Sequence, residues 1–223
     1  MAFWKVNGSE EAVKDRAEGN WISKSGIYNV TLKHVLFQQS QNGSKSLNFV
    51  IDLDGQEQVM YNAIRLTNND GTDNFEANLF NKLCVVCGAA DGDDVHDPVP
   101  VTLKIGNKEA EQYQELQDFQ NENVLMRVQM EYRRYNESIQ EKRAIKNFFR
   151  ITDKATAQEI INGVEPGKQY IEEEKIGDKI TYKDGLTPEE VQTWIKNGRN
   201  KGNDQQDDTK SFGKQRHTFG RTA

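Results

Sequence analysis

The sequence lacks the features that place proteins in membranes or outside cells. It contains no run near the roughly 18 apolar residues of a membrane-spanning helix. The N-terminal stretch turns acidic without the apolar segment of a signal peptide. Only two cysteines occur, Cys84 and Cys87, which are too few for a disulfide framework. These absences predict an intracellular protein with reduced thiols.

Signatures of catalysis and of metal binding are also missing. There is no Walker-type glycine loop and no Ser/His/Asp set. A metal site at Cys84 and Cys87 would need both His34 and His96 to converge, a spacing that matches no strong zinc signature. The interpretation that we favour is two small apolar side chains packed inside a helix, with a metal or redox site as the alternative.

An acidic loop is the remaining candidate for cation chemistry. Its carboxylates would suit a divalent ion for phosphodiester cleavage, but no paired motif accompanies them. We therefore favour a solvated loop over a metal-dependent nuclease, and we predict a protein that is not an enzyme and has no cofactor. The four residues are Asp91, Asp93, Asp94 and Asp97.

Composition suggests a globular body with weakly folded ends. Only 35% of the 223 residues are hydrophobic, which is little for a chain that is compact throughout. The predicted divisions are an N-terminal extension (1–24), a body (25–152), a C-terminal helical extension (153–197) and a disordered basic tail (198–223).

Hydrophobic periodicity predicts a β-rich body. Tyr28, Val30 and Leu32 share one face of a long strand, and Val35 and Phe37 continue that face after a slip of one residue, which is typical of a β-bulge. "SLNFVIDLDG" and "QVMYNAIRL" alternate cleanly and are joined by an Asp-Gly turn, so they form a hairpin. The three strands are a meander.

Further along, the apolar spacing changes. A helical stripe made by Phe75, Leu79, Leu83 and Val86 predicts one helix after the meander. A short strand is predicted in "VPVTLKI", followed by a polar helical or irregular segment. "NVLMRVQMEYRRY" and "KRAIKNFFRI" return to period two, as a hairpin with a loop of about six residues.

The C-terminal part carries weaker signals. They predict a short helix at "TAQEIING", a strand in "DKITYK" and a helix that begins after Thr187. Three meander strands, a helix and a closing hairpin are the element order of an OB-fold. The predicted fold class is therefore mainly β with a few helices: a five-stranded Greek-key OB-fold barrel, a small helical extension and a disordered tail.

Positive charge is scarce overall but concentrated in one place. The formal net charge is −6, yet residues 131–150 hold six Arg or Lys and four aromatic side chains. Such asymmetry indicates a cationic face for a partner. Rings between cations suit single-stranded nucleic acid, because rings stack on bases of any sequence while Arg and Lys contact phosphates.

Period two sorts this hairpin into an inner and an outer face. Ile145, Phe149 and Ile151 are predicted to face the core, which leaves Phe148 outward between cations. A solvated basic hairpin edge is the alternative reading. The predicted nucleic-acid contacts are Tyr61, Tyr135 and Phe148 for stacking, and Arg65, Arg127, Arg133, Arg134, Lys142, Arg143, Lys146 and Arg150 for phosphates.

Three stretches resemble the single-stranded DNA-binding proteins of tailed bacteriophages. They are "EEAVKDRAEGNWISKSGIYNVTLKHV", "LTNNDGTDNFEANLFNKLCVVCG" and "EYRRYNESIQEKRAIKNFF", within residues 1–150. The resemblance implies an OB-fold that coats single-stranded DNA in phage replication and recombination, without catalysis, in the cytoplasm of the infected bacterial host. The chain departs from many such proteins by ending in "KSFGKQRHTFGRTA" rather than in an acidic tip.

An interaction module is the alternative function. In that case a phage accessory protein would bind a polymerase or an RNA polymerase through the helix around Trp194 and the tail, whose two Phe-Gly units lie next to cations. The partners predicted by the first reading are single-stranded DNA and, through the C-terminal region, phage or host replication proteins.

Overall fold

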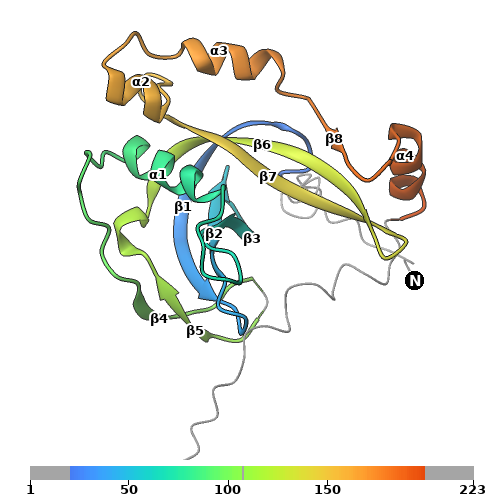
Figure 1. The fold of residues 1–223 in the computed structure, drawn as a ribbon, viewed down its shortest axis with the longest axis horizontal. Coiled ribbons are helices and arrows are strands. Elements are labelled where there is room, and N and C mark those ends of the chain that lie inside the picture. The colour runs from blue at the N-terminus through green and yellow to red at the C-terminus, as the bar shows by residue number, and fades with distance from the viewer. Residues whose placement is uncertain (1–20, 107, 199–223) are drawn as a thin grey trace, which may run out of the picture.

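The computed structural model describes residues 21–106 and 108–198. Most elements are strands of one sheet (Figure 1). The strands are β1 (Gly26–Gln39), β2 (Lys45–Leu53), β3 (Gln56–Arg65), β4 (Val99–Leu103), β5 (Glu111–Glu115), β6 (Glu122–Tyr135), β7 (Ser138–Arg150) and β8 (Thr181–Tyr182). The helices are α1 (Ala77–Val86), the 3-10 turn η1 (Gln117–Phe119), α2 (Ala157–Asn162), α3 (Lys168–Lys175) and α4 (Pro188–Lys196).

Strand β1 organises the sheet because it has neighbours on both edges. Its first part pairs with β6, its end pairs with β5, and β2 follows its other edge from Thr31 onward. The pairing with β2 shifts between Leu32 and His34, so the predicted bulge is confirmed. A bulge increases local twist, which lets one long strand serve two parts of the sheet.

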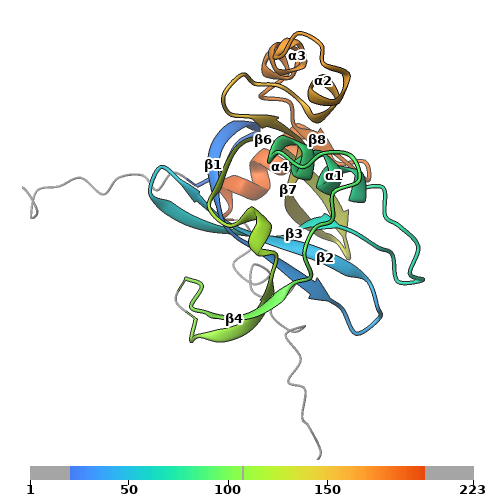
Figure 2. The same cartoon turned by 90° about the vertical axis from the view of Figure 1, so that its left-hand side faces the viewer.

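The sheet is antiparallel except where β8 runs parallel to β6. Within the described residues β3 and β7 contact each other but share no hydrogen-bonded ladder. The body is therefore mainly β, and backbone pairing does not close the predicted barrel. The β4–β5 hairpin extends from the end of the molecule opposite α2 and α3 (Figure 2).

The turn between β6 and β7 is tighter than predicted. Tyr135 pairs with Ser138, so the loop has two residues where the sequence suggested about six. Asn136 (φ 45°) and Glu137 (φ 64°) are both in the left-handed region, as a type I′ turn requires. The polar stretch after the turn is thus strand rather than loop, and the cationic hairpin is longer.

A bulge in β7 overturns the predicted orientation of Phe148. Arg127 pairs with Asn147 while Val128 pairs with Ile145, so Lys146 is the extra residue. After one extra residue the faces of a strand exchange. Phe148 accordingly lies fully buried in the main core, with its ring centroid 6.3 Å from that of Phe49.

Phe149 is buried as well, on the other side of the strand. Its ring meets that of Tyr170 in α3 edge-on, with 5.3 Å between centroids. The helical extension therefore covers the face that would otherwise be solvent-exposed. Both faces of β7 are apolar near its end, because Phe148 and Phe149 point to opposite sides. The alternation of the sequence alone could therefore not identify which face is solvent-exposed.

The prediction that Arg127 contacts phosphates is also wrong, because this side chain is only 1% exposed. Its guanidinium donates to the carbonyl oxygens of Gly26, Val128 and Ile176, and its Nε lies 3.6 Å from a carboxylate oxygen of Glu173. Burial lowers the pKa of Arg127, although Glu173 opposes the shift. The side chain joins the sheet to α3.

Helix α1 is shorter than its predicted stripe. Leu83 and Val86 are buried and Leu79 packs against the core, as expected. Phe75 was predicted to belong to this stripe, but it precedes the helix and is 80% exposed. The stripe prediction is wrong at Phe75 because the N-cap of the helix is Glu76, one residue further along the chain.

Of the three helices α2, α3 and α4 that follow β7, the sequence predicted two. Helices α2 and α4 begin at capping boxes headed by Thr156 and Thr187, so the predicted start of α4 is confirmed. Helix α3 and strand β5 were not predicted. No helix among residues 21–106 and 108–198 is long and apolar enough to cross a membrane. Most of the N-terminal extension and the tail from residue 199 lie outside the described residues.

Phe148→Ala is expected to lower the free energy of unfolding by about 3–5 kcal/mol, because it removes a fully buried ring. Urea denaturation followed by circular dichroism measures the loss. The matched control is Phe75→Ala, which truncates a ring that is 80% exposed and is expected to change stability by less than about 0.5 kcal/mol. Equal losses for the two variants would contradict this placement.

Candidate functional site

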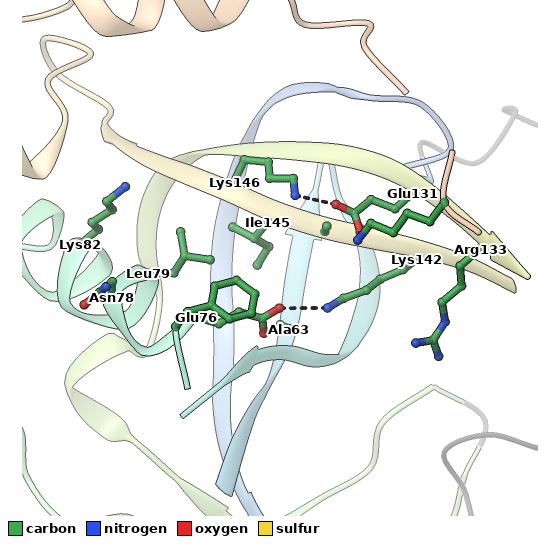
Figure 3. Close-up of a pocket in the computed structure, with 13 residues that line it drawn as sticks. Ala63, Glu76, Asn78, Leu79, Lys82, Glu131, Arg133, Lys142, Ile145 and Lys146 are labelled. Carbon is green, nitrogen blue, oxygen red and sulfur yellow. Dashed lines mark hydrogen bonds and ion pairs between the residues drawn. The ribbon is translucent and has the colours of Figure 1, made fainter. Parts of the chain in front are cut away.

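A pocket of about 360 Å³ lies between α1, β3, β8 and the β6–β7 hairpin (Figure 3). We call it the cationic pocket, because its lining includes five cationic side chains and only two carboxylates. It lies where β3 and β7 meet without a ladder. The charged lining residues are Lys82, Arg133, Lys142, Lys146 and Lys183, with Glu76 and Glu131.

Alternation along β6 gives the hairpin two different surfaces. Glu131 and Arg133 line the cationic pocket. Met130 precedes Glu131, and Tyr132 lies between Glu131 and Arg133. These two side chains pack against Trp194 and other apolar residues of α4. Covering one side with α4 leaves the charged side as the accessible one.

Glu131 holds two lysines from different elements. One carboxylate oxygen accepts a hydrogen bond from Lys146 of β7 and the other from Lys183 beside β8, each at 2.5 Å. Burial alone would raise the pKa of Glu131, but the two lysine hydrogen bonds outweigh it, so the pKa is lowered. The carboxylate is thus charged at neutral pH and fixes both ammonium groups at the pocket.

Glu76 connects β3 with β7 on the other side of the pocket. Its carboxylate accepts from the backbone N–H of Arg65 at the end of β3 (3.0 Å) and from Lys142 of β7 (3.2 Å), as Figure 3 shows for the lysine. The link spans the two strands that share no ladder. Lys142, Lys146 and Lys183 nevertheless keep 47%, 37% and 50% of their side chains exposed, so an anion can still reach them.

One exposed aromatic ring lines the cationic pocket, and a second lies against one of the arginines that line it. Phe75, 80% exposed, belongs to its lining, and Tyr135, 52% exposed, lies at the hairpin turn. The guanidinium of Arg133 sits 5.7 Å from the centroid of the Tyr135 ring. Tyr61 is less exposed and has Lys108 5.6 Å from its ring centroid, and it does not line the pocket.

Several of the predicted nucleic-acid contacts lie outside the cationic pocket. Arg134 pairs with Glu190 of α4 (2.8 Å), on the opposite side of the hairpin from Arg133. Arg150 makes two hydrogen bonds to Asp153 in the turn after β7. Arg65 and Arg143 do not line the pocket either, and Arg127 and Phe148 are buried. Of the predicted set, the structure brings Arg133, Lys142 and Lys146 together in the cationic pocket.

Sequence reasoning missed lining residues on which the character of the pocket depends, among them two lysines and one aromatic ring. Neither Lys82 nor Lys183 is among the nucleic-acid contacts predicted from the sequence. Both reach the pocket only because α1 and β8 pack beside the hairpin. Phe75 carried a usable signal, since it directly follows an Asn- and Asp-rich turn and precedes the helix proper.

The two cysteines were a candidate for a metal or redox site. Cys84 and Cys87 are half-buried in and after α1, and burial raises their pKa values to about 11 and about 12. They are therefore neutral thiols at physiological pH. Within the part of the chain that the structure describes, no three His, Cys, Asp or Glu side chains are grouped closely enough to hold a metal ion.

Glu131→Gln is expected to lower the free energy of unfolding at pH 7 by about 1–3 kcal/mol, because two charge-assisted hydrogen bonds are weakened. The pKa of Glu131 is lower in the folded state, so its contribution is present above the ordinary value of 4.5 and is lost as pH falls through the folded value. Urea denaturation at pH 7 and pH 3 measures this. A difference between variant and wild type that does not shrink at pH 3 would contradict the pairing.

Comparison with known proteins finds one family. A family model described as "Protein of unknown function (DUF669)" matches residues 12–144, more than half of the chain. The match includes the meander, α1 and most of the β6–β7 hairpin, and stops before α2. No curated protein matches the chain.

Proposed function

The chain belongs to the DUF669 family, whose function is unknown, and we propose that it binds single-stranded DNA in the cationic pocket without sequence preference. The observation that carries the proposal is the gathering of five cationic side chains beside the exposed Phe75 in a chain of net charge −6. They come from α1, β6, β7 and the residue that follows β8. Cations contact phosphates while a ring stacks on a base.

The electrostatics of the pocket favour an anion. Two carboxylates offset only part of the positive charge of five cations, and each is already occupied by lysines or a backbone N–H. Lysines fixed by carboxylates keep part of their donor capacity for a phosphate, since each ammonium has three donors. The chain's negative charge elsewhere directs a polyanion to this face.

The shape of the pocket favours a single strand over a duplex. A ring that is 80% exposed, such as Phe75, offers a stacking surface that only an unpaired base can use. A duplex presents stacked bases and could contact only the cations. We therefore expect much weaker binding of duplex DNA.

The connectivity supports the proposal that the body is an OB-fold. The order of meander, α1 and closing hairpin, with β6 returning to pair with β1, agrees with that fold. The β4–β5 hairpin and η1 are then an insertion between α1 and β6. The resemblance to tailed-phage single-strand binders extends the proposal to phage replication and recombination in a bacterial cytoplasm.

The alternative function, protein recruitment through α4, lacks a specific observation in its favour. Val191, Trp194 and Ile195 of that helix pack on the β6–β7 hairpin, together with Leu186. The apolar side of α4 is thus used inside the chain. The tail that the alternative also invokes lies outside the described residues.

Arg133→Gln is expected to weaken binding of labelled oligo-dT at low salt, because it removes one phosphate contact. The slope of log affinity against log salt should become shallower by about 0.7. Fluorescence anisotropy at several salt concentrations measures both effects. The matched control is Arg134→Gln, an adjacent arginine directed at Glu190 and away from the pocket. Equal losses for the two variants, or equal affinity of wild type for duplex and single strand, would refute the site.

Phe75→Ala is expected to weaken oligo-dT binding by about 1–3 kcal/mol with an unchanged salt slope, since it removes stacking and no charge. The same anisotropy titrations provide the measurement. Tyr61→Ala is the control, because Tyr61 is a partly exposed ring outside the pocket. If Tyr61→Ala caused the larger loss, the DNA path would lie on a different face.

A further inference from the structure

A second hollow of about 240 Å³ lies between α1 and α2. We call it the α1–α2 hollow. It shares Lys82 with the cationic pocket, so one lysine side chain borders both. Its lining residues are Asn81, Lys82, Val85, Ala157, Gln158, Ile161 and Asn162.

The lining combines an apolar surface with carboxamides. Val85, Ala157 and Ile161 supply aliphatic surface, and Ile161 is 66% exposed. The other members include Asn81 and Gln158, whose side chains form no hydrogen bond with any residue that the structure describes. The hollow therefore offers a flat ligand an apolar wall and unused donors and acceptors.

We propose that the α1–α2 hollow is a second subsite, which takes one unstacked nucleobase of the strand held in the cationic pocket. Lys82 contacts the phosphate that joins the two positions. This inference rests on the proposed function, because it assumes that a strand occupies the neighbouring pocket. The inference also gives the course of the DNA strand, which runs from the β6–β7 hairpin past Lys82 to α2.

The chemistry of the hollow fits a base better than other ligands. Nucleobases have apolar faces and polar edges, and proteins that bind single strands often splay a base out and bond its edge. A carboxamide both donates and accepts, so it can pair with the edge of any base, which agrees with binding that tolerates any sequence. The volume is below the roughly 300–1,000 Å³ of small-molecule sites, and therefore suits one ring system rather than a whole cofactor.

The position of α2 is fixed independently of the proposed ligand. Thr156 and Glu159 form a capping box, and the Glu159 carboxylate also accepts from the backbone N–H groups of Gly167 and Gln169. Ala157 is buried against α1 in the main core. The exposed side chains of α2 can therefore be truncated without removing what holds the helix.

The test uses the double variant Gln158→Ala/Ile161→Ala of the full chain and two labelled probes, oligo-dT and an abasic strand of equal length. Both probes carry the same phosphates, but only one carries bases. We expect the variant to lose roughly 5- to 100-fold in affinity for oligo-dT and nothing for the abasic strand. The control is Ile171→Ala, which truncates an exposed aliphatic side chain of α3 outside both hollows and should change neither affinity.

The outcomes separate the two proposals. If the wild type binds neither probe, the proposed function fails and the subsite with it. If the wild type binds oligo-dT but the variant is unchanged, or loses equally for both probes, the subsite is refuted while binding in the cationic pocket stands. A thermal melt of the variant within two degrees or so of wild type shows that a selective loss reflects the ligand and not folding.

Discussion

One extra residue in β7, Lys146, determines how the hairpin serves both the core and the pocket. The bulge at this position turns Phe148 into the core and Phe149 toward α3. It also places the Lys146 ammonium group on Glu131, which holds Lys183 as well. Without the insertion, the alternation of β7 would run unbroken, and the apolar and cationic residues would exchange faces.

Carboxylates are the means by which the protein keeps cations close together. Like charges repel at short range, and five cations around one pocket would separate if nothing offset them. Glu131 holds Lys146 and Lys183, and Glu76 holds Lys142 together with the backbone N–H of Arg65, so each carboxylate connects segments that are far apart in sequence. They arrange the cations before any ligand arrives, which reduces the cost of ordering flexible lysines on binding.

The sequence predicted those parts of the fold that depend on local pattern. The bulge in β1, the Asp54-Gly55 hairpin and the cap of α4 each have a short-range cause, and each is present. The orientation of Phe148 depends instead on the bulge in β7, and the burial of Arg127 depends on α3. The sequence revealed neither feature. In the pocket, Arg133 and Lys142 came from the hairpin pattern, whereas Lys82 and Lys183 arrive through tertiary packing, which no periodicity encodes.

The anchoring of the helical extension by Arg127 affects how the protein can be divided. The family match ends at residue 144, inside β7. A chain trimmed there would lose the second half of that strand, the Phe148 ring and the carbonyl of Ile176 to which Arg127 donates. A fragment that ended at this boundary would leave the Arg127 guanidinium beside the sheet without the carbonyl and the carboxylate that α3 and its C-cap supply.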